Sequence, residues 1–266
     1  MGSDLRAAGR TVRRLIRFAL VVAALGSVAG ITAGFAGYSK RDALGAVVDG
    51  CALNKTIFGS AFPCVSVEQA PSSIAYALLK PPSSPTELLL VPTTAIAGIE
   101  TPALRKPTGA LYWQAAWEAR GAVSAALGRP LDRTAIGLAV NSGQARSQDR
   151  FHIHVDCLGY VNRQLIAAHR SDITTQWRRF SVELEHRHFW MRRVAGSDLS
   201  AINPVALMLD GLPFAHREPA GMSLAVLGAT FEDGSEGFYL AAEQADPRMP
   251  GSGSAEDLLD HSCNGF

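Results

Sequence analysis

An uncharged segment near the N-terminus limits the fold of this chain more than any other part of its sequence. Residues 18–38 (FALVVAALGSVAGITAGFAGY) contain no charged side chain. At about 1.5 Å per residue, a helix of about 20 apolar residues matches the hydrocarbon thickness of a bilayer. We therefore expect one membrane-spanning signal-anchor helix, followed by a large domain at residues 39–266. A cleaved signal peptide is the alternative, with small-residue cleavage positions such as Ala33 or Ala36.

This segment divides the charges of the chain unevenly. Residues 1–17 hold five arginines and one aspartate, a net charge of +4, whereas the whole chain carries only +1. The positive-inside rule places this basic segment in the cytoplasm and the domain on the other side of the membrane. We expect a single-pass protein of the inner (cytoplasmic) membrane whose domain is periplasmic. The near-neutral balance argues against a nucleic-acid partner, because nucleic-acid-binding proteins carry a basic excess.

Four cysteines, Cys51, Cys64, Cys157 and Cys263, fit an exported domain. Their spacing contains no C-x-x-C, so it does not indicate a zinc site or a redox pair. An even number in an exported domain predicts two disulfides, for which four cysteines allow three connectivities. A bond between the first two would close a short loop, and one between the last two would join the end of the chain to its middle. For Cys157, which lies in an apolar strand pattern, the alternative is a buried thiol.

The exported part has the pattern of one α+β domain with a predominantly antiparallel sheet. Strands are predicted at residues 74–79, 87–91, 135–140, 150–157, 173–177, 189–194, 223–227 and 237–240. Helices are predicted at residues 39–50 and 108–127. Trp113 and Trp117 are four residues apart in the second helix, which predicts that both pack in the core.

The most informative segment is DRFHIHVDC at residues 149–157, in which polar and apolar residues alternate strictly from the arginine onward. In a β-strand, such alternation sends side chains to opposite faces. The apolar face comprises Phe151, Ile153, Val155 and Cys157, and the polar face comprises Arg150, His152, His154 and Asp156. Because the apolar face must pack on the core, the two imidazoles, about 7 Å apart along the strand, face a cleft or solvent. We predict that His152 and His154 are catalytic.

Polar side chains in and before this strand supply donors suited to phosphate oxygens. The candidates for phosphate binding are Asn141, Ser142, Arg146, Gln148 and Arg150. With these donors in place, a neutral His152 could attack phosphorus in line while His154 stabilises the equatorial oxygens. Alternatively, His152, His154 and Asp156 could ligate a metal from one strand face. A third possibility is that both histidines are solvated strand residues without chemistry.

Residues 141–157, NSGQARSQDRFHIHVDC, resemble the signature of membrane-anchored CDP-diacylglycerol pyrophosphatases, a branch of the histidine-triad superfamily. Similar stretches lie at LLLVPT (88–93), YWQAAWEAR (112–120), Arg192–Val194 and Asp260–Cys263. The basic segment, the single anchor and the four cysteines also correspond. The resemblance therefore extends over nearly the whole chain.

This resemblance implies a histidine-triad-like antiparallel sheet with packed helices, and a hydrolase that needs no metal or other cofactor. The substrate would be a nucleotide-linked phospholipid, CDP-diacylglycerol, cleaved to CMP and phosphatidic acid through a nucleotidyl-histidine. His152 matches the nucleophile and His154 the third histidine of the triad, while Asn141 and Gln148 match residues that hold the nucleotide phosphate. Arg150 occupies the first triad position, a departure from the family pattern. This departure suggests a non-catalytic nucleotide- or lipid-binding module as the alternative function.

The remaining histidines carry no comparable pattern. They are expected to serve packing or to lie at the surface, and they are His169, His186, His188, His216 and His261. Among them His188 is the best further candidate for the site, because it precedes the aromatic pair Phe189–Trp190.

Overall fold

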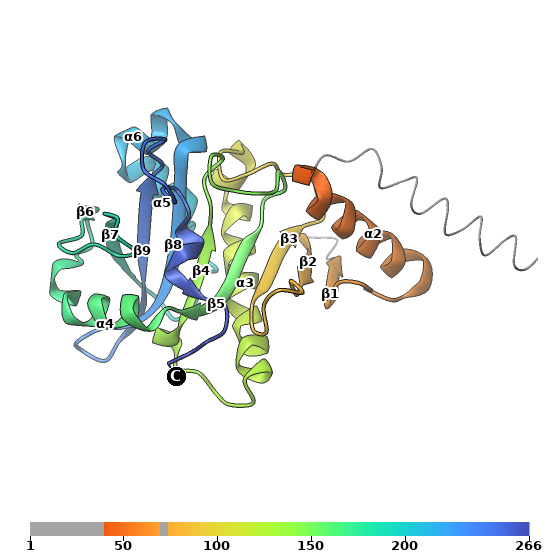
Figure 1. Ribbon diagram of the computed structural model, residues 1–266, viewed down its shortest axis with the longest axis horizontal. Coiled ribbons are helices and arrows are strands. Elements are labelled where there is room, and N and C mark those ends of the chain that lie inside the picture. The colour runs from red at the N-terminus through yellow and green to blue at the C-terminus, as the bar shows by residue number, and fades with distance from the viewer. Residues whose placement is uncertain (1–39, 70–73, 266) are drawn as a thin grey trace, which may run out of the picture. The chain divides into compact units, whose positions relative to one another are not determined.

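The computed structural model describes residues 40–69 and 74–265, and the domain considered below begins at Arg41 (Figure 1). The basic segment predicted at residues 1–17 and the membrane span predicted at residues 18–38 lie outside the described residues. Within the described ranges, none of the helices combines the length and the apolar character that crossing a bilayer requires.

A ten-stranded antiparallel sheet forms the centre of the domain and confirms the α+β prediction. Its strands lie in the order β1-β2-β3-β5-β4-β8-β9-β7-β6, and β10 pairs with β5 outside this path. The strands are β1 (Ser66–Gln69), β2 (Ala75–Leu79), β3 (Leu88–Pro92), β4 (Ile136–Val140), β5 (Ile153–Leu158), β6 (Arg178–Arg179), β7 (Trp190–Ala195), β8 (Met222–Thr230), β9 (Glu236–Gln244) and β10 (Leu259–Asp260). This order places β5 between β3 and β4 in the interior of the sheet, so both of its edges are paired, and all six of its residues are buried.

One face of the sheet is covered by α3 (Pro107–Ala126), which follows the helix predicted from the sequence within one residue at each end. Trp113 and Trp117 are buried in the main core cluster, as predicted. Two short helices, α5 (Pro204–Gly211) and α6 (Pro213–Arg217), add side chains to the same cluster. Burial of this apolar face is the main force that holds the helices on the sheet.

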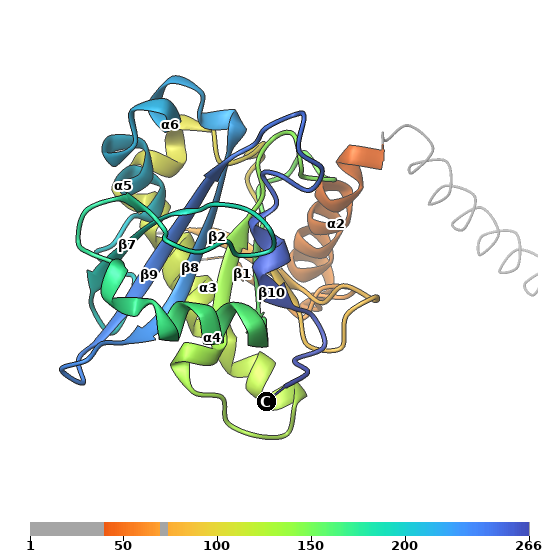
Figure 2. The same cartoon turned by 60° about the vertical axis from the view of Figure 1, so that its left-hand side comes forward.

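The opposite face carries α4 (Tyr160–Ala168) and the C-terminal segment (Figure 2). Ile166 of α4 and Leu258 of the C-terminal segment share a second apolar cluster there. The remaining helix, α2 (Ala43–Phe58), buries Leu44, Val48 and Cys51 against β1, β2 and β3. These three positions recur at helical spacing, so one face of α2 packs on the edge of the sheet.

Two disulfides join Cys51 to Cys64 and Cys157 to Cys263. Of the three possible connectivities, the one that closes a short loop and ties the end of the chain to its middle is therefore present. The alternative of a buried Cys157 thiol is wrong. Because Cys157 lies on β5, the second bond holds the C-terminal segment against the central strand.

Several sequence-based boundaries differ from the structure. Residues 173–177 were predicted as a strand but form a loop, in which the Trp177 indole N–H donates to the Leu207 carbonyl at 2.9 Å. The helix predicted at residues 39–50 continues to Phe58, because its apolar positions recur beyond residue 50. The strand predicted from residue 150 begins at Ile153. No sequence pattern predicts β1, β6, β10, α4, α5 or α6.

Candidate active site

The two faces of β5 are arranged as the alternation predicts. Phe151, Ile153, Val155 and Cys157 all belong to the core cluster beneath α3. The opposite row is also removed from solvent, since only 7% of His152, 5% of His154 and none of Asp156 is exposed. Both histidines therefore lie at a buried position beside a cavity and are not solvated surface residues.

A cavity of about 430 Å³ opens beside His152 and His154. Its walls come from the first half of α2, from the start of β3, from the loop between β4 and β5 and from the C-terminal segment. The polar lining side chains are Ser83, Glu87, Asn141, Ser147, Gln148, His152, His154, Ser254 and Glu256. Leu44, Val47 and Leu89 give it one apolar wall. The cavity therefore offers both polar and apolar contacts to a ligand.

His152 is held as a neutral imidazole with a defined tautomer. Its Nδ1 lies 2.6 Å from the backbone carbonyl oxygen of Arg150, and a carbonyl can only accept a hydrogen bond. Nδ1 therefore carries the ring proton, and Nε2 carries the lone pair. Burial, with a smaller contribution from the nearby His154, lowers the pKa of His152 to about 4. At neutral pH the ring is thus an uncharged base and a competent nucleophile.

His154 is oriented by carboxylates on both sides of its ring. Nδ1 lies 2.6 Å from Oε1 of Glu87, and Nε2 lies 3.4 Å from Oε2 of Glu256. Glu256 in turn accepts a hydrogen bond of 2.8 Å from the side-chain amide of Asn141. The rings of His152 and His154 are 4.8 Å apart between centroids, so both can contact the same group in the cavity.

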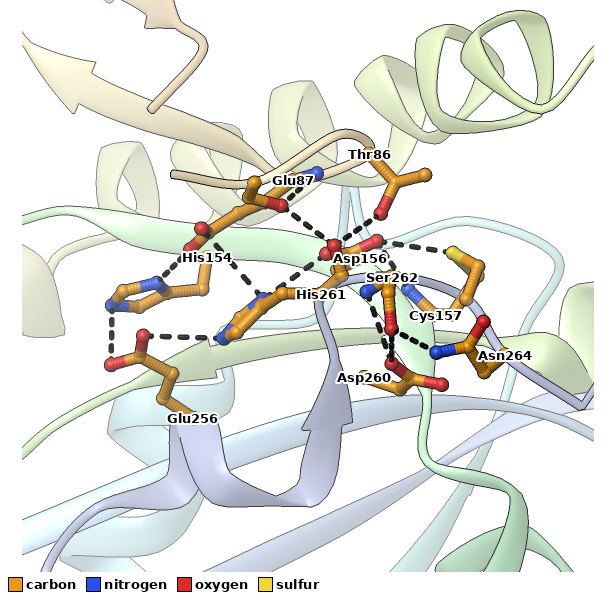
Figure 3. A network of polar contacts seen from close by, with 12 residues as sticks. Thr86, Glu87, His154, Asp156, Cys157, Glu256, Asp260, His261, Ser262 and Asn264 are labelled. Carbon is orange, nitrogen blue, oxygen red and sulfur yellow. Dashed lines mark hydrogen bonds and ion pairs between the residues drawn. A yellow bond between two sulfur atoms is a disulfide. The ribbon is translucent and has the colours of Figure 1, made fainter. Parts of the chain in front are cut away.

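His261, which the sequence analysis assigned to packing or to the surface, is part of this network (Figure 3). Its Nδ1 lies 3.1 Å from Oδ2 of Asp156, and its Nε2 lies 3.3 Å from Oε1 of Glu256. Glu87 is 3.7 Å from Nδ1. The bonds to Asp156 and Glu256 raise the pKa of His261 to about 10, so the ring is an imidazolium at neutral pH.

Two of the carboxylates around His261, those of Asp156 and Glu256, have pKa values shifted in opposite directions. Burial raises the pKa of Asp156, and the hydrogen bond from His261 opposes that shift only in part. Burial also raises the pKa of Glu256, but the hydrogen bond from His261, the electrostatic interaction with His154 and the hydrogen bond from the amide of Asn141 outweigh it and lower the value to about 2. Glu256 is therefore ionised at neutral pH, and its carboxylate lies 3.4 Å from Nε2 of His154 and 3.3 Å from Nε2 of His261.

The C-terminal segment delivers His261 to this position. Asp260 pairs with Cys157 in the β10–β5 ladder, and Cys263 is bonded to the same Cys157. The carbonyl of His261 accepts hydrogen bonds from the hydroxyls of Ser84 and Thr86, at 2.8 and 3.0 Å. The cysteine spacing held the signal that the sequence analysis overlooked, because a Cys157–Cys263 bond brings His261 next to Asp156.

Of the five phosphate-binding candidates, two line the cavity. Asn141 and Gln148 contribute their amides to its wall, and Oε1 of Gln148 also accepts a 2.8 Å bond from the backbone N–H of Leu44 on α2. Ser142 is fully buried away from the cavity, and its hydroxyl accepts from the N–H of Ala145. The predicted phosphate contact is thus geometrically available to Asn141 and Gln148 but not to Ser142.

The two arginine candidates also lie outside the cavity lining and form ion pairs within the protein. Arg146 contacts Glu100 at 2.7 Å and Asp149 at 3.0 Å. Arg150 is buried and pairs with Asp49 of α2. Arg150 therefore ties the segment before β5 to α2, which forms one wall of the cavity, whereas Arg146 and both of its partners lie outside the cavity lining. His188 likewise lies outside the cavity lining, and its Nε2 contacts Glu183 at 3.2 Å.

The ligand atoms of His152, His154 and Asp156 do not converge on one point, as a metal site would need. In the described part of the chain, convergent oxygen and nitrogen atoms occur instead at Glu87, Glu256 and His261, within 4.8 Å of one another. This set is an ion-pair cluster in which His261 already carries the positive charge. The donor set expected from the sequence therefore does not form a metal site.

A neutral buried histidine beside a second histidine that carboxylates orient, both facing one polar cavity, is an arrangement suited to an enzyme active site. Sequence comparison agrees with this class. The family model described as CDP-diacylglycerol pyrophosphatase matches residues 39–265. A CDP-diacylglycerol pyrophosphatase of Yersinia pestis is 34% identical over 227 residues, which cover 85% of this chain and 85% of that protein. The chain belongs to the CDP-diacylglycerol pyrophosphatase family, and the resemblance noted in its sequence is confirmed.

Proposed function

We propose that this protein hydrolyses the pyrophosphate bond of CDP-diacylglycerol and releases CMP and phosphatidic acid. The observation that carries the proposal is the state of His152, a neutral ring whose Nδ1 is bound to the Arg150 carbonyl beside an open polar cavity. Membership of the family supports the choice of substrate. The same arrangement supports a histidine-triad type of chemistry on this antiparallel sheet.

In the first step, Nε2 of His152 attacks the phosphorus that carries cytidine. The N–P bond forms as the bond from that phosphorus to the bridging oxygen breaks, and phosphatidic acid leaves with the bridging oxygen. The product on the enzyme is a cytidylyl-histidine. Its ring carries a positive charge, which the hydrogen bond from Nδ1 to the Arg150 carbonyl stabilises. Water then attacks the same phosphorus, CMP departs with the water oxygen, and the free imidazole is restored.

His154 acts beside the nucleophile. Glu87 fixes its Nδ1 side, and Nε2 faces Glu256, so the ring has one orientation within reach of the phosphate. We assign to His154 the contact with the non-bridging oxygens and the handling of the proton of the attacking water. Asn141 and Gln148 supply amide groups in the same wall of the cavity.

We further propose that residues 18–38 anchor the enzyme as a single span, with the N-terminus cytoplasmic and the domain on the periplasmic side of the inner membrane. Both disulfides suit an oxidising compartment. A diacylglycerol substrate remains in the bilayer, and an anchored enzyme meets it at a raised effective concentration. Proteolysis of intact spheroplasts should degrade the domain, and protection of the domain would refute this topology.

Acid-quench trapping tests the nucleophile directly. CDP-diacylglycerol labelled in its cytidylyl phosphate should leave label on the peptide that contains His152. The variant His152→Ala should neither retain label nor release CMP, whereas the matched control His169→Ala, which changes a partly exposed histidine outside the cavity lining, should do both. CMP release by His152→Ala at the normal rate would refute the nucleophile. Tight substrate binding without CMP release by the unaltered protein would favour a non-catalytic binding module.

A further inference from the structure

The end of α2 and the loop that follows it expose an unusual group of large apolar side chains. Of the eight such exposed side chains in the described residues, five lie here, and we call them the α2 patch. They are Leu53, Ile57, Phe58, Phe62 and Val65, with 57–74% of each residue exposed. In Figure 1 this end of α2 lies at the margin of the domain, away from the strands β6 to β9. Clusters of this kind on soluble surfaces mark contact sites.

The helical geometry shows that the patch is not a frayed part of the core. Leu44, Val48 and Cys51 form the buried face of α2. Leu53 lies nine residues after Leu44, which at about 100° per residue places it on the opposite side of the helix. Ile57 follows one turn later on that outer side. The second half of α2 is therefore apolar on both sides, and the outer side needs its own apolar environment.

The patch is also held rigidly. The Cys51–Cys64 disulfide joins the helix to the loop that carries Phe62 and Val65. The side-chain amide of Asn54 donates to the Phe62 carbonyl at 2.8 Å, and the N–H of Gly59 donates to the Lys55 carbonyl at 3.1 Å. These bonds fix Phe58 and Phe62 in their exposed positions.

The charged side chains around the α2 patch indicate which kind of surface it contacts. From residue 50 to residue 67 the only charged side chain is Lys55, which is exposed and lies between Leu53 and Ile57. An apolar surface with one lysine and, between Asp49 and Glu68, no carboxylate suits the boundary between acyl chains and anionic phosphates of a phospholipid leaflet. The described part of the chain begins at Lys40, shortly before α2, and in the sequence the uncharged run at residues 18–38 precedes this helix by only a few residues.

We propose that the α2 patch is a bilayer-contact surface that inserts into the leaflet holding the diacyl substrate. The other half of the same helix, at Leu44 and Val47, forms the apolar wall of the catalytic cavity. Val47 and Ile57 are ten residues apart on one helix, a distance of about 15 Å. A patch seated in the leaflet thus holds the cavity within reach of a lipid headgroup. The inference rests on the proposed function for the identity of the substrate, whereas bilayer contact itself is tested without catalysis.

Site-directed fluorescence tests the contact. Because all four native cysteines are in disulfides, a cysteine introduced by Phe58→Cys is the single thiol that a fluorophore can label. Val161→Cys, at an exposed apolar position on α4, is the matched control. The full-length protein is reconstituted in vesicles of phosphatidylcholine and phosphatidylglycerol in equal amounts, with or without doxyl-labelled acyl chains. We expect doxyl lipids to quench the label at position 58 and aqueous iodide to quench the label at position 161.

Two other outcomes would overturn the proposal. Quenching at position 58 by iodide alone would leave the patch in water. Quenching by neither agent would indicate that protein covers the patch, either residues 1–39 of the same chain or a second copy. Cross-linking of the reconstituted protein then separates those two occupants.

Kinetic measurements test whether the α2 patch raises the rate of cleavage of a substrate in the bilayer. The double variant Phe58→Ser, Phe62→Ser should lower kcat/KM for long-chain CDP-diacylglycerol in vesicles by at least about tenfold, because two buried phenyl rings are lost from the lipid contact. Its kcat/KM for a short-acyl analogue dissolved as monomers should match that of the unaltered protein. The control is Tyr160→Ser, Val161→Ser, which removes exposed apolar side chains from α4. An equal loss on both substrates, or no loss on either, refutes the role of the patch, whereas an unaltered protein that cleaves neither substrate refutes the proposed function.

Discussion

Replacement of His261 by glutamine is the most informative single change, because it removes one charge and keeps a side chain of similar size. His261 is an imidazolium that contacts Asp156, Glu256 and Glu87 at 3.1, 3.3 and 3.7 Å. Glutamine can still donate one hydrogen bond, but it offers no positive charge to three carboxylates. The loss of the positive charge is most unfavourable for Asp156, since none of its surface is exposed to water.

The size of the effect follows from that burial. Removal of one partner from a buried ion pair costs about 3–5 kcal/mol, because an uncompensated charge remains. Two features reduce this cost here. Asp156 still accepts a 2.8 Å bond from the N–H of Cys157, and burial raises its pKa so that it can take up a proton. The side chain of His261 is also 34% exposed, so water replaces part of its contact. We expect His261→Gln to lower the free energy of unfolding by about 2–3 kcal/mol at neutral pH.

The pH dependence of the free energy of unfolding shows the sign of the electrostatic contribution of His261. The folded-state pKa of His261, about 10, lies above the ordinary value of 6.5. A raised pKa means that the folded state binds the proton more tightly, so this stabilisation is complete below 6.5 and is lost as the pH rises through about 10. The electrostatic part of the difference between the unaltered protein and His261→Gln should therefore be largest at about pH 6.5 and below, and should shrink toward about pH 10.

Urea unfolding of the oxidised proteins at neutral and alkaline pH measures this difference. His169→Gln is the matched control, because His169 is partly exposed and its Nδ1 lies 3.7 Å from Oδ2 of the exposed Asp172. We also expect kcat of His261→Gln to fall roughly tenfold to a hundredfold, since Glu256 and hence His154 lose their fixed position. A stability loss equal to that of the control, or one that grows above about pH 10, would refute the reasoning.

Four further predictions concern the pKa of His152, the two disulfides and the effect of EDTA. His152, whose pKa is lowered to about 4, should keep the enzyme active well below pH 6.5; a pH–kcat/KM profile that falls near 6.5 instead would contradict its burial. The same lowered pKa means that the unfolded chain binds the proton more readily, so urea titrations should show the His152 contribution to stability being lost as the pH falls from 6.5 toward 4. Replacement of both Cys157 and Cys263 by alanine should destabilise the protein by about 4–5 kcal/mol, against about 3 kcal/mol for Cys51 and Cys64, because the sequence separations are 106 and 13; equal midpoints in urea would show that loop length does not decide the effect. EDTA should leave the rate of CMP release unchanged, and a loss that added divalent cations restore would support metal-assisted hydrolysis.

The parts of the fold that follow from local patterns could be predicted from the sequence. The alternation from Arg150 to Cys157 gives the two faces of β5, because a strand repeats every two residues. The spacing of Trp113 and Trp117 gives α3, because a helix repeats after about four residues. Both patterns bury one apolar face, so tertiary packing agrees with the local preference.

Elements without such a pattern could not be predicted in this way. The helix α5 lies in a mostly apolar run and α6 is only five residues long, so periodicity gives no clear signal for either. Pro204 and Pro213, each at the first position of its helix, were the available markers. Residues 173–177 contain β-branched residues and a tryptophan, which favour a strand, but here the Trp177 side chain bonds to the Leu207 carbonyl of α5.

The residues of the site likewise fall into two groups, those that a local sequence pattern identifies and those that it does not. His152 and His154 are adjacent on one strand face, so the alternation alone identifies them. Glu87, Glu256 and His261 come from the start of β3, from the turn before β10 and from the C-terminal segment. They meet only because β5 pairs with β3 and with β10, and no local pattern records that pairing.

The ion pairs of Arg146 and Arg150 bear on how this near-neutral chain binds a pyrophosphate. Arg150 pairs with Asp49, and the N–H of Leu44 donates to Gln148, so the loop before β5 is tied to α2 at two points. These contacts position the helix that forms one wall of the cavity. We expect the charge of the pyrophosphate to be met by the histidines and amides that line the cavity, not by these arginines. Imidazole and amide groups bind a dianion less tightly than guanidinium groups would, which favours release of CMP after each turnover.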